Sequence, residues 1–171
     1  MEFLEVIKTR RSIRKYLETP VPDESLQRIL DVGRIAPSAA NKQPWHFILI
    51  KDKTQQLKIK PAYDREWLQN APVILIVCVD INKGWTRADG REYSTVDAAI
   101  TMHSMILAAA NEGLGTCWIA NFKELELKKV LNIPENITPI AMTPIGYPDS
   151  EEKLRPFERK TLKEILHEEN W

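Results

Sequence analysis

The pattern of apolar and polar residues predicts helices and strands that follow one another along the whole chain. Apolar residues spaced three or four positions apart predict helices, which we expect at residues 3–10, 22–36, 54–60, 65–70, 94–113 and 123–132. Runs rich in β-branched and aromatic residues predict strands, which we expect at residues 45–50, 73–79, 116–120 and 138–146. This order predicts a sheet covered by helices, in an α/β or α+β arrangement.

In three segments the residue pattern predicts more than the type of element. The run VILIVCV at 73–79 is apolar on both faces and predicts a central strand. The long helix begins at Ser94, a residue that can cap a helix, with Asp97 three residues later. The C-terminal segment 158–171 is amphipathic and predicts a terminal helix. The apolar stripe of the long helix, which we expect to face the core, comprises Val96, Ala99, Ile100, His103, Ile106, Leu107 and Ala110.

Composition narrows the class of protein. The 171 residues fit one domain spanning 1–171, and the longest apolar run is too short to cross a bilayer. The N-terminus lacks the pattern of a secretory signal, so we expect a cytoplasmic protein. The 24 basic and 24 acidic side chains balance, which argues against general nucleic-acid binding. The spacing of Cys78 and Cys117 suits neither a disulfide framework nor a metal site, so we expect two reduced, buried thiols and no bound metal.

The segment TRRSIRKY at 9–16 concentrates cations within this neutral chain. In an extended segment Arg10, Ser12 and Arg14 would share one side, whereas in a helix only Arg10 and Arg14 would be neighbours. Either geometry pairs two guanidinium groups, which suit a phosphate monoester. Taken alone, the cluster is more typical of a solvated surface or of salt bridges to acidic side chains.

The loop APSAANKQPW at 36–45 is a second candidate site. Prolines stiffen both of its ends, and its small residues would let a ligand approach the backbone. Its amide side chains can both donate and accept hydrogen bonds, as the edge of a heterocycle requires. By itself the loop is equally well interpreted as an ordinary polar turn.

Several common catalytic motifs are missing from the sequence. The stretch EGLGTCWIANF at 112–122 lacks the third glycine of a dinucleotide-binding fingerprint and follows a predicted helix. The sequence has no Walker phosphate loop, nucleophile elbow or zinc-protease helix. The three histidines are scattered, and no pair of carboxylates stands out as an acid/base couple. No side chain is therefore a clear catalytic candidate.

Taken in order, several segments resemble the nitroreductase family of FMN-dependent oxidoreductases. They are RRSIRKY, APSAANKQPWHFILI, LQNAPVILIVCVD, DAAITMHSMILAAANEGLGTCWIANF and IPENITPIAMTPIGYP, which together span nearly the whole chain. The resemblance implies an α+β fold with a central, mostly antiparallel sheet flanked by helices. It also implies an intertwined homodimer with two FMN sites at the interface, in which the C-terminal segment reaches over the partner subunit.

The resemblance also implies which residues bind the cofactor. Arg10, Arg11, Ser12 and Arg14 match the family's flavin motif. Arg10 and Ser12 would hold the phosphate and ribityl end, and Arg14 would lie near the ring. The other subunit would contribute a loop that contacts the ring and the ribityl chain through the residues Pro37, Ser38, Ala39 and Asn41, with Gln43 nearby.

Two further contributions would complete the site. The backbone of Ala120 and Asn121 would face the ring. A cation from the C-terminal segment would bind the phosphate, and we expect Arg159, with Arg155 as the alternative, because Arg159 precedes the predicted terminal helix.

The function implied by the resemblance is centred on the flavin. The enzyme would use NADH or NADPH to reduce a small-molecule electron acceptor, such as a quinone or nitroaromatic compound, by a ping-pong mechanism. No side chain would be catalytic, and Arg14 would give electrostatic support. Alternatives are a specialised flavin reaction on the same fold, such as dehalogenation or flavin cleavage, and a non-catalytic flavin-binding protein. A basic interaction module is a further alternative, against which the zero net charge argues.

Overall fold

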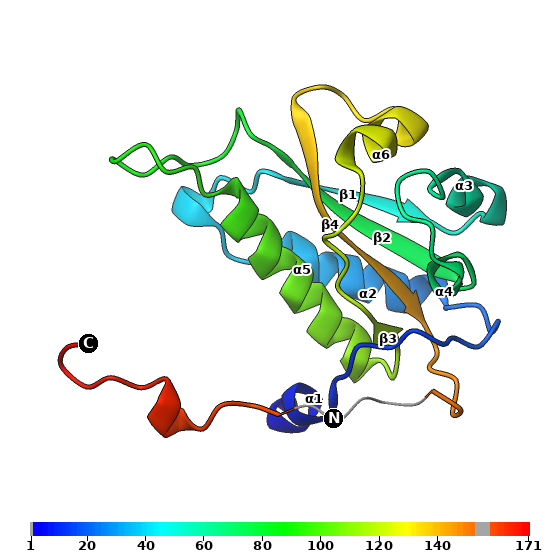
Figure 1. Ribbon diagram of the computed structural model, residues 1–171, viewed down its shortest axis with the longest axis horizontal. Helices are drawn as coiled ribbons and strands as arrows, with labels where there is room; N and C mark the ends of the chain where they lie inside the picture. Colours follow the sequence, from blue (N-terminus) through cyan, green and yellow to red (C-terminus); the bar gives the residue numbers. More distant parts are fainter. Residues whose placement is uncertain (1, 153–157) are drawn as a thin grey trace.

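The centre of the molecule is a four-stranded sheet (Figure 1). The computed structural model describes residues 2–152 and 158–171. The strands lie in the order β1, β2, β4, β3, and each neighbouring pair is antiparallel. Their bounds are β1 (Trp45–Ile50), β2 (Val73–Asp80), β3 (Gly115–Thr116) and β4 (Ile137–Gly146). The expected mostly antiparallel sheet is confirmed.

β2 is the central strand that its sequence predicts. All of its residues are buried, because β1 pairs with one of its edges and β4 with the other. Successive side chains of a strand point to opposite faces, so β2 contributes to a separate hydrophobic cluster on each face of the sheet. One cluster contains Leu75, Val77 and Val79, and the other contains Ile74, Ile76 and Cys78.

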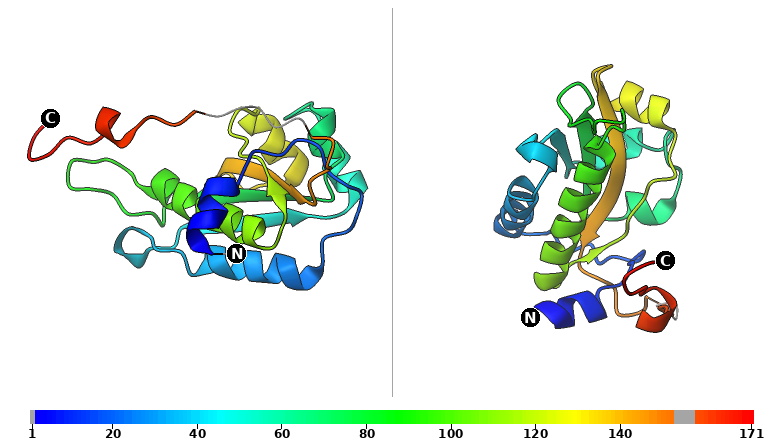
Figure 2. Two further views of the ribbon diagram at one scale, coloured as in Figure 1. Left: turned by 90° about the horizontal axis from the view of Figure 1, so that it is seen from below. Right: turned by 90° about the vertical axis from the view of Figure 1, so that its left-hand side faces the viewer.

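Helices cover both faces of this sheet (Figure 2). α2 (Asp23–Arg34) and α5 (Ser94–Asn111) pack on the first cluster. α3 (Lys53–Lys58), α4 (Glu66–Gln69) and α6 (Glu124–Leu131) lie over the second. In the part of the chain that the structure describes, no helix is long and apolar enough to span a membrane. The arrangement confirms the α+β class.

The face that α5 buries differs from the predicted stripe. Ile106 is buried as expected, but Val96 and Ile100 remain 39% and 36% exposed. The hydroxyl of Thr101 donates a hydrogen bond of 2.7 Å to the backbone oxygen of Gly33 in α2, so a polar contact turns this side of the helix inward. The buried residues of α5 are Ser94, Asp97, Ala98, Thr101, Met102, Met105, Ile106 and Ala109.

Two predictions about helix ends are wrong. Tyr93 is the N-cap residue of α5, and Ser94 is its first helical residue. The terminal helix is reduced to the short 3-10 turn η2 (Leu162–Glu164). The rest of this segment extends away from the body of the molecule (Figure 1). Its apolar side chains remain largely exposed, Leu162 at 68% and Trp171 at 99%, and the Trp171 ring stacks only locally on His167, at 4.3 Å between centroids.

Candidate functional site

An extended segment carries the arginine cluster. It follows α1 (Phe3–Thr9), and Ser12 forms a parallel bridge with Thr116 of β3. The backbone N–H of Ile13 donates to the oxygen of Thr116 at 2.9 Å. Ile13 is buried, whereas Ser12 and Arg14 are exposed. The extended alternative for this segment is therefore the correct one, and it presents Ser12 and Arg14 outward.

Three guanidinium groups lie close enough to affect one another near the start of this segment. Burial lowers the pKa of Arg10, and the charges of Arg159 and Arg11 lower it further. The structure thus brings the C-terminal cation Arg159 to the N-terminal cluster, although the two are far apart in sequence. The alternative cation, Arg155, lies outside the described residues.

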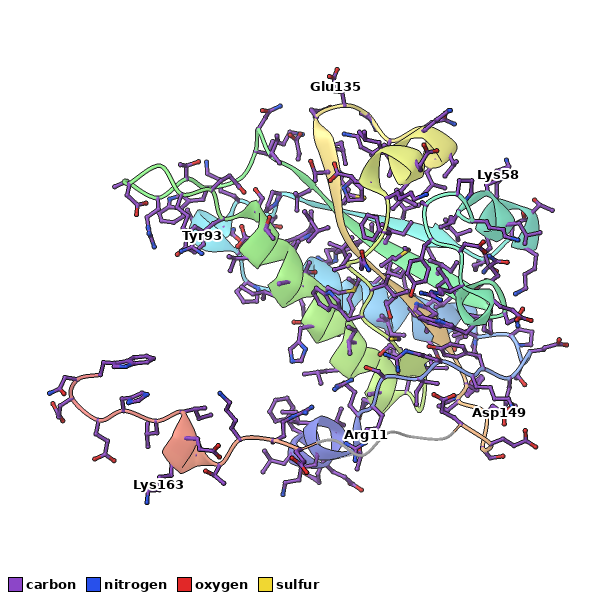
Figure 3. All side chains as sticks on the ribbon, in the orientation of Figure 1. Arg11, Lys58, Tyr93, Glu135, Asp149 and Lys163 are labelled. Carbon is purple, nitrogen blue, oxygen red and sulfur yellow. The ribbon has the colours of Figure 1, made fainter. Side chains whose placement is uncertain are left out.

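Acidic side chains neutralise only part of the cluster. The ammonium of Lys15 forms ion pairs with Asp149 at 3.1 Å and Glu151 at 2.5 Å, and its hydrogen bonds to these carboxylates raise its pKa. Glu152 accepts a bond of 3.2 Å from the backbone N–H of Arg14, not from its guanidinium. In Figure 3, Asp149 lies on the chain segment that follows β4, apart from Arg11.

The thiol of Cys117 lies beside the same segment. Burial raises the pKa of Cys117, while Arg14, the side chain of Ser12 and Arg10 act in the opposite direction. Cys117 and Cys78 are both buried and unpaired, as expected. The stretch after β3 therefore forms one wall of a site around Arg10, Ser12 and Arg14, which we call the arginine site.

A pocket of about 600 Å³ opens on this wall. It brings together residues that sequence reasoning placed at one site, namely Arg14, Ala120 and Asn121. A neighbouring hollow of about 930 Å³ shares Arg14, Arg65 and Trp67 with it. Arg14 therefore lines two adjacent hollows, which make the surface around its side chain concave.

The lining residues that sequence reasoning missed include Tyr63, Arg65 and Trp67. The guanidinium of Arg14 lies 5.8 Å from the centroid of a Trp67 ring, within the range of a cation–π contact. The rings of Tyr63 and Trp67 meet edge to face at 6.0 Å. The signal that could have found them is the pair of aromatic residues spaced four apart around Arg65; the sequence pattern assigns Arg65 and Trp67 only to a short helix at 65–70 and gives Tyr63 no role.

The loop between α2 and β1 has an unusual backbone. Ala40, Asn41 and Gln43 have φ angles of 48°, 54° and 49°, a region that residues other than glycine seldom occupy and that is enriched at functional sites. The loop contains the 3-10 turn η1 (Ala39–Asn41). The hydroxyl of Ser38 accepts a bond of 2.9 Å from the backbone N–H of Gln43. Strain of this kind favours the functional interpretation of the loop over an ordinary turn.

The loop and the arginine site lie on opposite faces of the sheet. Ala36 and Trp45, which flank the loop, belong to the cluster beneath α5. Ile119 and Phe122, which flank Ala120 and Asn121 in the pocket, belong to the cluster on the other face. The loop and the arginine site are also separated along α5: in Figure 3 Arg11 lies near one end of the helix and Tyr93 at the other, which is the end where Asp97 contacts the loop. Within one chain, the two predicted halves of the site do not meet.

Comparison with known proteins agrees with this architecture. The sequence profile of the nitroreductase family matches residues 7–64 and 53–147. A relative from Archaeoglobus fulgidus, provisionally named NADH dehydrogenase/NAD(P)H nitroreductase, is 33% identical over 175 residues, and the match covers 99% of each chain. FMN reductase (NAD(P)H) of Bacillus subtilis is 31% identical, with 98% of this chain and 74% of the relative covered.

A solved structure supports the same assignment. The crystal structure of a nitroreductase family protein from Clostridium difficile 630 superposes with a TM-score of 0.90 at 32% identity and covers 100% of both chains. The chain described here belongs to the nitroreductase family.

Proposed function

We propose that the protein is an FMN-dependent oxidoreductase that uses NADH or NADPH to reduce small acceptors such as quinones and nitroaromatic compounds. The observation that carries the proposal is the concave surface around Arg14, which adjoins the cluster of Arg10, Arg11 and Arg159. One end of this site is cationic and the other is aromatic, as a flavin mononucleotide requires.

The cationic end fits a phosphate group. A phosphate monoester carries nearly two negative charges at neutral pH and can accept several charge-assisted hydrogen bonds. Arg10 and Arg159 would bind it, with the exposed Ser12 beside them as a hydroxyl donor. Burial and then the charges of Arg159 and Arg11 lower the pKa of Arg10, so a bound anion would offset both the loss of solvation and the repulsion among the cations.

The aromatic end fits a flat ring with polar edges. Tyr63 and Trp67 supply apolar contact area in the pocket, and Asn121 supplies backbone and amide groups. Arg14 would stabilise negative charge on the ring, because a preorganised cation stabilises charge that develops beside it. When bound, FMN supplies hydride transfer between the nicotinamide and the acceptor, which explains why the sequence offers no acid/base pair.

A homodimer is part of the proposal. The loop with Ser38 and Asn41 lies on the opposite face of the sheet from Arg14, so a second copy would have to supply it to the same ligand. Apolar side chains that a partner could cover remain exposed on the isolated chain, among them Phe3 at 67% and Ile100 at 36%. A dimer would bury these side chains and complete the site in one step.

The test of the function is spectroscopic. The purified full-length protein, reconstituted with FMN, should show a bound-flavin visible spectrum that bleaches when NADH or NADPH is added without oxygen. Addition of a quinone or a nitroaromatic compound should restore the colour. A protein that cannot bind FMN would overturn the proposal. Bound flavin that neither nicotinamide reduces would instead identify a non-catalytic flavin-binding protein.

A further inference from the structure

A buried carboxylate links α5 to the loop between α2 and β1. Asp97 is only 1% exposed, and its Oδ1 accepts a hydrogen bond of 2.9 Å from the backbone N–H of Ala39. The two residues are 58 positions apart in the chain. The contact therefore fixes the start of the loop to the first turns of the long helix.

The surroundings of Asp97 make its charged form energetically unfavourable. Burial raises the pKa of Asp97, the Ala39 N–H opposes this effect, and the charge of Glu92 adds to it. Its Oδ2 is buried and has no hydrogen-bond partner among the described residues. A buried polar atom without a partner is destabilising, although the N-terminal end of a helix favours negative charge.

The loop that Asp97 holds is itself strained. Ala40 and Asn41 follow Ala39 directly, and both have positive φ angles. Residues in such conformations persist where surrounding contacts fix them. A hydrogen bond to a charged acceptor is stronger than one to a neutral acceptor, so the carboxylate is well suited to hold this backbone in place.

We propose that Asp97 is a positioning residue for the cofactor: it holds the Ala39 amide so that the strained loop presents Ser38 and Asn41 to the flavin. The inference rests on the proposed FMN function, and it concerns the side chain that shapes the site rather than one that touches the ligand.

The experiment compares three variants of the full-length protein. Asp97→Ala removes the acceptor, Asp97→Asn keeps an acceptor oxygen without the charge, and Thr101→Val is the matched control. Thr101 lies in the same helix, is buried, and bonds to α2 and not to the loop. The dissociation constant for FMN is measured by fluorescence quenching on the flavin-free protein, and the melting temperature is measured alongside.

Asp97→Ala should raise the dissociation constant for FMN by about tenfold, the effect of one charge-assisted hydrogen bond. Asp97→Asn should raise it by less than about threefold, and Thr101→Val should lower the melting temperature without changing FMN affinity. Unchanged affinity in Asp97→Ala would overturn the proposal. A loss in Asp97→Asn as large as that in Asp97→Ala would also overturn it, because the hydrogen bond would then not be the cause.

A second measurement does not depend on the flavin. Hydrogen–deuterium exchange of the flavin-free protein should become faster in a peptide covering residues 36–44 in Asp97→Ala, but not in Thr101→Val. If the wild-type protein fails to bind FMN, the proposed function fails, and exchange still decides whether Asp97 holds the loop. If FMN binds and exchange in the loop is unaffected by Asp97→Ala, the positioning role alone is wrong.

Discussion

Arg14 and Lys15 are adjacent cations with different surroundings. Both line the larger hollow, but the ammonium of Lys15 is held by Asp149 and Glu151, whereas the guanidinium of Arg14 lies against Trp67 and also lines the smaller hollow. Alternation and the family resemblance singled out Arg14 in the sequence, but they could not show that carboxylates pair with Lys15. The acidic residues that distinguish them come from a segment more than 130 positions away.

This difference predicts the outcome of a matched pair of substitutions. Arg14→Ala should weaken FMN binding by about tenfold, as expected for loss of one charge-assisted contact, and should make the bound flavin harder to reduce. Lys15→Ala should change both properties much less, because the ammonium of Lys15 is already paired with two carboxylates. Dissociation constants from fluorescence titration and a redox titration of the holoprotein check the prediction. Equal affinities and potentials in wild type and Arg14→Ala would rule out the proposed role of Arg14.

At the scale of elements, the sequence predicted most of the secondary structure but not how it packs. The run at 73–79 identified β2 because burial on both faces leaves an unbroken apolar pattern. The apolar stripe predicted for α5 did not identify its buried face, because that face includes Ser94, Asp97 and Thr101. Asp97 and Thr101 make hydrogen bonds to Ala39 and Gly33, which are distant in sequence, and periodicity does not encode such contacts.

The packing of α2 against the end of α5 gives a prediction of pH dependence. Glu112, just after α5, accepts hydrogen bonds from Arg28 at 2.8 and 2.6 Å and from Ser25 at 2.9 Å. Chiefly because of the Arg28 bonds, its pKa falls from 4.5 to about 2. A lowered folded-state pKa stabilises the protein above the unfolded-state value, and this stabilisation is lost as the pH falls through about 2.

Glu112→Gln should therefore lower the melting temperature at pH 7 by about 2–4 °C, as expected for a loss near 1 kcal/mol in a chain of this length. The difference from wild type should shrink steadily when the pH is reduced from about 4.5 toward 2. Thermal unfolding followed by circular dichroism at several pH values checks this. Glu135→Gln, at an exposed position in the loop after α6, is the control and should match wild type throughout. A constant difference across the pH range would contradict the assignment.

At the scale of the whole molecule, the proposed site is divided between two faces. One face carries Arg14 and Asn121, and the other carries the loop with Asn41. The family resemblance pointed to all three and implied that the loop comes from the other subunit, whereas residue patterns alone could not place the loop and Arg14 on different faces, because that depends on how the sheet is covered. If a second copy completes the site, as we propose, dimerisation is a condition for cofactor binding.

Complementation between two defective chains tests this division. Arg14→Ala and Asn41→Ala chains, carrying different affinity tags, are co-expressed and the mixed dimers are purified through both tags. If each site combines the arginine segment of one chain with the loop of the other, one site of the mixed dimer holds both substitutions and the other holds neither. Half of the sites should then bind FMN with wild-type affinity, while each parental homodimer binds about tenfold more weakly. If each site is built from a single chain, every site in the mixed dimer carries one substitution. An FMN titration of the mixed dimer in which no sites bind with wild-type affinity would therefore exclude the shared site.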